Sequence, residues 1–307
     1  MRNYSMDSLK LICAILVMCI HTPQIENMVD YIAPLYRCAV PIFFMISGYF
    51  TYGKKNLDST IRRRIIDQLK IFCWALIFYF IVALFNKGLG AFSILGSLMT
   101  TGCLLGNYVT YAEHLWYILA YVYVLLVMLL VERYNMYKFL FCITPVLLII
   151  AVIAGTYSEM LFGHSYSLYY TRNFLFTGLP FFALGMIAKR MKSISVPAMI
   201  ASCMIFYATG LLEVKSFEFS TGDIYISTIF LSISIFLLFV NIRQTKDNFI
   251  SRTGREDGLY IYIFHFFVAI SVPYDDRFLY ASVPVVLCLT LLFIAILRKT
   301  RVIGRVI

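Results

Sequence analysis

MDSLKLICAILVMCIH, residues 6–21, is the stretch of sequence that decides the fold. Apolar residues fill it, with Asp7 and Lys10 near its start and His21 at its end. A helix that spans a bilayer needs about 20 predominantly apolar residues. The run from 9 to 26 approaches that length, so we interpret it as a first transmembrane helix.

Stretches of the same kind recur along the whole chain. Of its 307 residues, 61% are hydrophobic and 14% are charged, whereas average soluble chains are about 45–50% apolar and about 25% charged. A soluble domain of this size has no interior large enough for so much apolar surface, but lipid tolerates it. The sequence therefore predicts an all-α, polytopic helix bundle of about ten transmembrane helices, at 9–26, 31–52, 68–86, 114–132, 138–155, 172–188, 196–213, 223–240, 258–273 and 281–297.

The positive charges indicate the orientation of these helices. The net charge is +10, but the basic residues sit in short loops between apolar spans, which argues against a nucleic-acid partner. If the apolar stretch 91–106 does not cross the membrane, most of these residues fall on one side, the cytoplasmic side by the positive-inside rule. We therefore expect a single domain, 1–307, multi-pass in the plasma membrane, with both termini cytoplasmic and with 91–106 re-entrant or lying on the outer surface.

Ionisable residues within the spans are candidates for function, because they are costly in lipid. Lys10 and His21 are 11 residues apart, so they share a helix face within about 20° and lie about 16 Å apart along the axis. Such a face could line a path through the bundle. Alternatively, Lys10 reaches to the headgroups and His21 caps a neighbouring helix.

Other polar residues are expected in the outer half of the membrane. Arg37 lies near the outer end of the second span, and Glu113 and His114 open the fourth, where an adjacent acid and imidazole could transfer protons. Trp116 and Tyr117 follow them and fit an aromatic belt. We predict that the candidate outer residues gather around one cavity; they are His21, Arg37, Glu113, His114 and Arg172. His265, in mid-span, is either a core histidine or a direct participant.

A basic connection follows the second span. It reads KKNLDSTIRRR, residues 54–64, and ends in Arg62, Arg63 and Arg64. It could bind anionic lipid headgroups, or it could hold a phosphorylated cytosolic ligand. The eight cysteines include no CxxC pair, and we expect no metal site.

Taken in order, several of these segments resemble the acyltransferase-3 family of integral membrane acyltransferases. The resemblance implies ten spanning helices and transfer of an acyl group, commonly acetyl, from cytosolic acyl-CoA to a hydroxyl of a glycan or other acceptor. The family's first-span basic residue and histidine map onto Lys10 and His21, although the family more often has arginine at the first position. The segments that carry the resemblance are MDSLKLICAILVMCIH, RCAVPIFFMISGYF (37–50), the basic connection, HLWYILA (114–120), TRNFLFTGLPFFALG (171–185) and YIYIFH (260–265).

Together, residues and resemblance lead to one main hypothesis, an O-acyltransferase of the cell envelope with acetyl-CoA or another acyl-CoA as co-substrate. We predict that His21 is the general base and that Arg37 or Arg172 stabilises the oxyanion or orients the acceptor. The residues predicted for catalysis are His21, Arg37, Glu113 and His114. Those predicted to bind acyl-CoA are Lys10, Arg62, Arg63 and Arg64. Those predicted to bind the acceptor are Arg172, Asn173, Trp116 and Tyr117.

A second hypothesis belongs to a different class. The first two spans and the HLWY and TRN segments also resemble the membrane domain of the membrane-bound serine racemases of vancomycin resistance. That domain is thought to handle amino-acid supply. The same polar face could then translocate serine or another small solute, without acyl-CoA.

Overall fold

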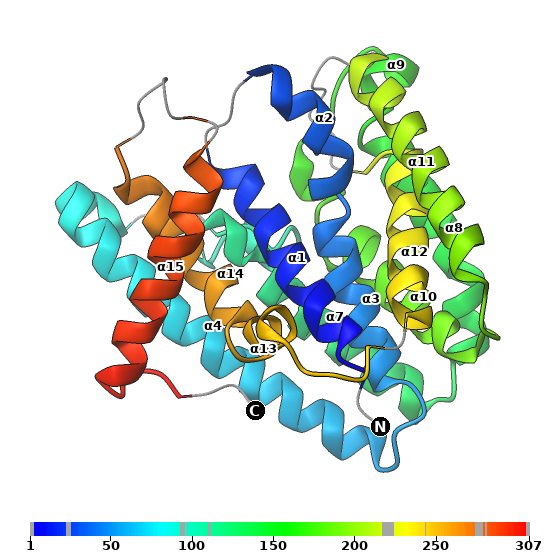
Figure 1. Cartoon of the computed structure of the whole chain (residues 1–307), viewed down its shortest axis with the longest axis horizontal. Helices are drawn as coiled ribbons and strands as arrows, with labels where there is room; N and C mark the ends of the chain where they lie inside the picture. The colour runs from blue at the N-terminus through cyan, green and yellow to red at the C-terminus, as the bar shows by residue number, and fades with distance from the viewer. Residues whose placement is uncertain are drawn as a thin grey trace. The chain divides into compact units, whose positions relative to one another are not determined.

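The computed structural model describes residues 3–22, 26–92, 96, 98–109, 112–216, 224–242, 244–273, 279 and 281–304. Within these residues every regular element is a helix (Figure 1). The longer helices are α1 (Ser5–His21), α2 (Glu26–Tyr36), α3 (Ala39–Thr51), α4 (Leu57–Lys87), α7 (Trp116–Arg133), α8 (Tyr137–Ala154), α10 (Leu179–Arg190), α11 (Val196–Ser216), α12 (Ile226–Asn241), α13 (Phe249–Glu256), α14 (Gly258–Ser271) and α15 (Ser282–Lys299).

Six helices in the described part of the chain are long and apolar enough to cross a membrane, and α12 and α14 are shorter apolar helices. This confirms an all-helical membrane protein. Each of the ten predicted spans overlaps helical structure, although α4 begins at Leu57, well before the span predicted at 68–86, and the number of spans stays a prediction. The six long helices are Met28–Thr51, Leu57–Lys87, Glu113–Arg133, Tyr137–Ala154, Val196–Ser216 and Ser282–Lys299.

Two stretches differ from a simple pattern of spans and loops. The end of the predicted basic connection is helical, because α4 begins at Leu57; Asp58 and Arg62, one turn apart, form an ion pair that favours this turn. In the stretch 91–106, the elements with described bounds are a 3₁₀ turn, Gly88–Phe92, and the four-residue helix α6, Thr101–Leu104, and residues 96 and 98 are also helical. Both elements are far too short to span a bilayer, while residues 93–95 and 97 lie outside the described part.

The chain divides into two compact units. The first unit comprises 1–43, 192–218 and 226–307. In it α1 packs against α13 and α14, α14 packs against α15, and α11 packs against α12 and α2 (Figure 1). Gly254 of α13 permits the closest of these approaches, because a Cβ there would lie 1.9 Å from the backbone oxygen of Asp7.

The second unit comprises 44–191 and 219–225. In it α4 packs against α7, and α10 packs against α8. The crossing of α3 and α10 is very close: a Cβ on Gly48 would lie 2.0 Å from the carbonyl oxygen of Phe182, and one on Gly185 would lie 2.0 Å from that of Met45. Small residues allow such backbone contact between membrane helices.

Candidate functional site

His21 is the last residue of α1, and its imidazole lies against α14 within the first unit. The ring centroids of His21 and His265 are 5.4 Å apart, with the ring planes tilted by 47°. The ring of Phe266, the next residue on α14, is also 5.4 Å away and nearly perpendicular, at 80°. The predicted base therefore contacts two consecutive rings of one neighbouring helix.

His265 is fully buried in the same unit, with 0% of its surface exposed. Its Nδ1 lies 3.0 Å from the carbonyl oxygen of Ile261, one turn earlier on α14. A carbonyl oxygen only accepts hydrogen bonds, so Nδ1 carries a proton and donates it. The sequence left two interpretations of His265 open, a core histidine or a direct participant. The structure places its ring beside that of His21.

Arg37 lies in the turn between α2 and α3, also in the first unit. Its backbone N–H donates to the carbonyl oxygen of Ala33 at 3.2 Å, and its guanidinium carbon lies 6.0 Å from the ring centroid of Tyr36. Pro34 inside α2 and the adjacent turn interrupt the regular helix at this point. Arg37 is half-buried, and its place near His21 stays a prediction.

A pocket of about 400 Å³ lies within the second unit. Glu113, Trp116 and Arg172, three of the residues predicted for catalysis or acceptor binding, line it together. The Tyr108 hydroxyl donates a hydrogen bond of 2.6 Å to Oε1 of Glu113. The other lining residues were not predicted from the sequence; they are Gly106, Tyr108, Ser165, Tyr166, Ser167 and Leu168.

The remaining predicted residues of the second unit have different surroundings. His114 is 2% exposed, and its ring meets that of Tyr79 edge to face at 4.8 Å, whereas Glu113 is exposed at the pocket. Tyr117 packs edge to face on Phe44 at 4.7 Å. These neighbours give Glu113 and His114 separate environments, although the two residues are adjacent in sequence.

Asn173 holds the start of the irregular helix that leads into α10. Its side-chain oxygen accepts hydrogen bonds from the backbone N–H groups of Leu175 and Phe176, at 2.9 and 3.0 Å. Its side-chain nitrogen donates to the carbonyl oxygen of Tyr170 at 3.1 Å. Such a cap fixes the backbone next to Arg172, so the structure assigns Asn173 a local structural role. The predicted contact with an acceptor is untested.

The three contiguous arginines of α4 are not equivalent. Arg62 pairs with Asp58 at 2.7 Å, and Arg63 lies 3.9 Å from Asp67. Arg64 instead donates a hydrogen bond of 2.5 Å to the buried hydroxyl of Thr51. Partial desolvation and, to a smaller extent, the positive charge of Arg64 lower the pKa of Lys54. Of the three arginines, Arg64 is therefore the one that has a neutral partner, Thr51, and a cationic neighbour, Lys54.

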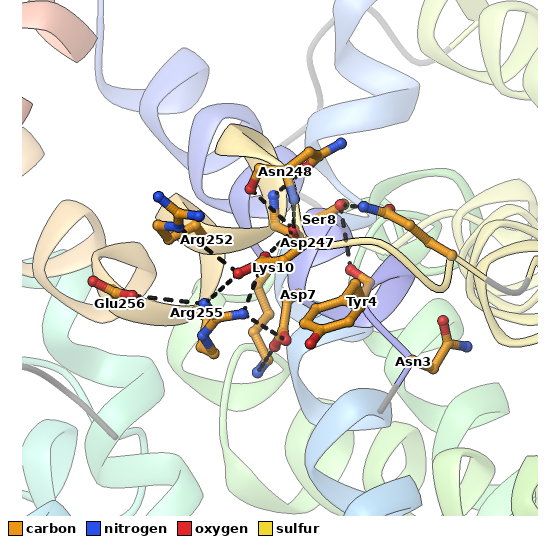
Figure 2. Close-up of polar contacts among 12 residues, drawn as sticks. Asn3, Tyr4, Asp7, Ser8, Lys10, Asp247, Asn248, Arg252, Arg255 and Glu256 are labelled. Atoms are coloured by element: carbon orange, nitrogen blue, oxygen red, sulfur yellow. Dashed lines mark hydrogen bonds and ion pairs between the residues drawn. The ribbon is translucent and has the colours of Figure 1, made fainter. Parts of the chain in front are cut away.

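Lys10 belongs to a set of interleaved charges where α1 meets α13, which we call the α1–α13 charge network (Figure 2). Lys10 Nζ lies 2.9 Å from Oδ1 of Asp7, one turn earlier on α1. Arg255 lies 3.8 Å from Asp7 and 2.9 Å from Asp247. The network comprises Asp7, Lys10, Asp247, Arg252, Arg255 and Glu256.

Arg255 dominates the electrostatics of the loop before α13. Its hydrogen bond to Asp247, with a second from the Ser251 hydroxyl, lowers the pKa of Asp247 to about 2. Asn248 caps α13 reciprocally with Ser251. Sequence reasoning missed this arrangement, because Asp7 and Asp247 are 240 positions apart and only the capping pattern Asn248-x-x-Ser251 is visible locally.

Comparison with known proteins gives the family. A family model described as an acyltransferase domain matches residues 3–299. The serine/alanine racemase of Enterococcus gallinarum is 30% identical over 128 residues, which cover 38% of this chain and 18% of that protein. No solved structure matches the chain. Because the family model covers nearly the whole sequence, the chain belongs to the acyltransferase-3 family of membrane acyltransferase domains.

Proposed function

We propose that the protein is a membrane-bound O-acyltransferase that moves an acyl group, acetyl in the first instance, from cytosolic acyl-CoA to a hydroxyl of a glycan or other cell-envelope acceptor. The family supports the transfer of an acyl group by a membrane protein. The positive-inside rule supports ten spans in the plasma membrane, with the amino-terminal end of α1 on the cytoplasmic side and His21 toward the outer side. In this proposal the two units act as one domain.

The observation that carries the proposal is the contact of His21 with the buried imidazole of His265 at the end of α1. His21 takes the proton of the acceptor hydroxyl as the acceptor oxygen bonds to the thioester carbonyl carbon. The carbon–sulfur bond then breaks, and the CoA thiolate leaves with the bonding electrons and receives the proton from His21. Arg37 or Arg172 stabilises the oxyanion in between.

In this proposal the donor is held on the cytoplasmic side. A phosphate binds best to cations whose charge is not already matched by carboxylates. Arg64, with its neutral partner Thr51, meets this condition together with Lys54. Lys10 lies about 16 Å along the helix from His21 and has Asp7 as its partner, so a phosphate must compete with that carboxylate.

The pocket of the second unit is proposed as the acceptor site. Its volume of about 400 Å³ falls in the range of ligand sites, about 300–1,000 Å³. Trp116 supplies an aromatic face, while Glu113 and Arg172 supply an acceptor and a donor of hydrogen bonds. These groups suit a polyhydroxylated molecule with an apolar face.

Radiolabelled acetyl-CoA and the full-length protein in liposomes test this proposal. We expect slow release of labelled acetate, with water as the acceptor, and label in alkali-sensitive esters when isolated cell envelope is added. Substitution His21→Ala should lower turnover by roughly 10²–10⁴-fold. The control is Ile20→Ala, which truncates the preceding side chain, 45% exposed. Undiminished turnover in folded His21→Ala protein would exclude the base role.

Translocation of a small solute is the second candidate, supported by the similarity to a protein named serine/alanine racemase. Uptake of labelled serine into the same liposomes, without acyl-CoA, tests it. Uptake that His21→Ala and Arg172→Ala abolish, in protein that neither binds nor hydrolyses acetyl-CoA, would replace the acyltransferase proposal by transport.

A further inference from the structure

His265 is a second imidazole beside the proposed base, and the role inferred for it rests on the function proposed for His21. It is fully buried on α14, where a hydrocarbon side chain would fill the same space without the cost of desolvating a polar ring. The ring is held by its own helix, because Nδ1–H donates to the carbonyl oxygen of Ile261 at 3.0 Å. Both its position and the plane of its ring are thereby fixed.

His21, by contrast, is the last residue of α1. The last torsion of a histidine side chain has broad energy wells, so an imidazole at a helix end takes its orientation from its neighbours. Two of those neighbours are His265 and Phe266, whose ring centroids are both 5.4 Å from that of His21. Their ring planes are inclined to that of His21 by 47° and 80°. Because the two rings face the imidazole at different angles, together they limit how far it can turn about its side-chain bonds.

Orientation matters because a general base must direct one ring nitrogen at the proton it removes. A misplacement of about 1 Å can reduce the rate by roughly 10²-fold. We propose that His265 is a positioning residue for the acyl transfer: anchored to the Ile261 carbonyl, it holds the His21 imidazole in the orientation that proton transfer requires. It touches neither acyl-CoA nor the acceptor in this role.

Kinetics of His265→Phe test this proposal, because phenylalanine keeps a ring of similar size and removes the anchoring nitrogen. Acetate release from labelled acetyl-CoA is measured with full-length protein in liposomes, together with thermal unfolding. The matched control is Phe264→Leu. Phe264 is equally buried on α14 but packs on Phe293 of α15, at 5.1 Å, and so reports loss of packing alone.

We expect His265→Phe to lower kcat by about tenfold or more, to change KM for acetyl-CoA less than twofold, and to leave the midpoint of unfolding unchanged. Phe264→Leu should lower the midpoint and leave kcat of the folded protein unchanged. If His265→Phe does not accumulate, His265→Gln, which keeps polar atoms without the ring, is judged by the same three measurements.

Two results would overturn the positioning role. One is a kcat in His265→Phe equal to that of the unsubstituted protein; the other is a loss of turnover that only follows a loss of folded protein. In both cases an inactive His21→Ala variant would leave the proposed function intact. Full turnover in His21→Ala would instead overturn the proposed function, and the role of His265 with it.

Discussion

Two basic clusters of this protein differ in what surrounds their charges. In the α1–α13 charge network (Figure 2), every cation has a carboxylate within 4 Å, as Lys10 has in Asp7. In the second unit, Arg64 bonds to the neutral Thr51, and its charge contributes to lowering the pKa of Lys54. The position of a basic residue in the sequence therefore does not show whether its charge can bind an anionic ligand. The acidic residues around it determine this.

The largest effect is expected where the charge network depends on a close helix crossing. Gly254→Ala puts a Cβ 1.9 Å from the Asp7 oxygen and 3.0 Å from the backbone nitrogen of Leu11. Backbone atoms cannot yield as a flexible side chain can, so α13 must move away from α1. Overpacking of this kind typically costs about 1–3 kcal/mol. Thermal unfolding in lipid nanodiscs measures the loss, and Gly304→Ala, which has open space around its Cβ, should show none.

The next effect is expected in ligand binding by Arg64 and Lys54, whose charges are not matched by a carboxylate in the described contacts. Arg64→Ala should raise the Kd for acetyl-CoA about tenfold or more, because a hydrogen bond to a charged group contributes about 1.5–3 kcal/mol. Equilibrium dialysis with labelled acetyl-CoA measures this change. The Kd should also rise with salt, since exposed charges are screened. An unchanged Kd would show that the phosphates bind elsewhere.

Apolar length was sufficient to predict the all-helical membrane fold, because it acts locally along the chain, whereas the orientation inferred from the positive charges stays a prediction. Glu113, which was predicted for catalysis, and Trp116 and Arg172, which were predicted for the acceptor, line one pocket, while their roles stay predictions. Three contiguous arginines, by contrast, look alike in sequence. Their difference arises from Asp58 and Asp67 on the same helix and from Thr51 on the preceding one.

Contacts between distant segments could not be predicted from a single sequence. Asp7 and Asp247 share Arg255 only because α13 folds back on α1. His265 reaches His21 for a similar reason, since α14 packs on α1. Local patterns fix the period and the ends of helices, but the choice of neighbour depends on side chains that are far apart in the chain.

A third, smaller effect is expected in the pH dependence of stability. The pKa of Asp247 is lowered to about 2 in the folded protein, against about 3.9 for an unperturbed aspartate. The carboxylate therefore stabilises the fold above about pH 4, and this contribution is lost as the pH falls toward 2. Unfolding midpoints measured from pH 6 to pH 2 should fall less steeply in Asp247→Asn than in the unsubstituted protein. Parallel curves would contradict the strength of the pairing with Arg255.

The smallest effect is expected at Arg62, which provides a direct comparison with Arg64. Arg62 and Arg64 are two residues apart on α4, but Arg62 is exposed and bound to Asp58 in a surface ion pair, a type that contributes little to stability. Arg62→Ala should therefore change the Kd for acetyl-CoA less than twofold and barely alter stability, in the same dialysis and unfolding experiments. If Arg62→Ala weakened binding as much as Arg64→Ala, the total positive charge of this helix end would govern binding. The partner of each side chain would then be irrelevant.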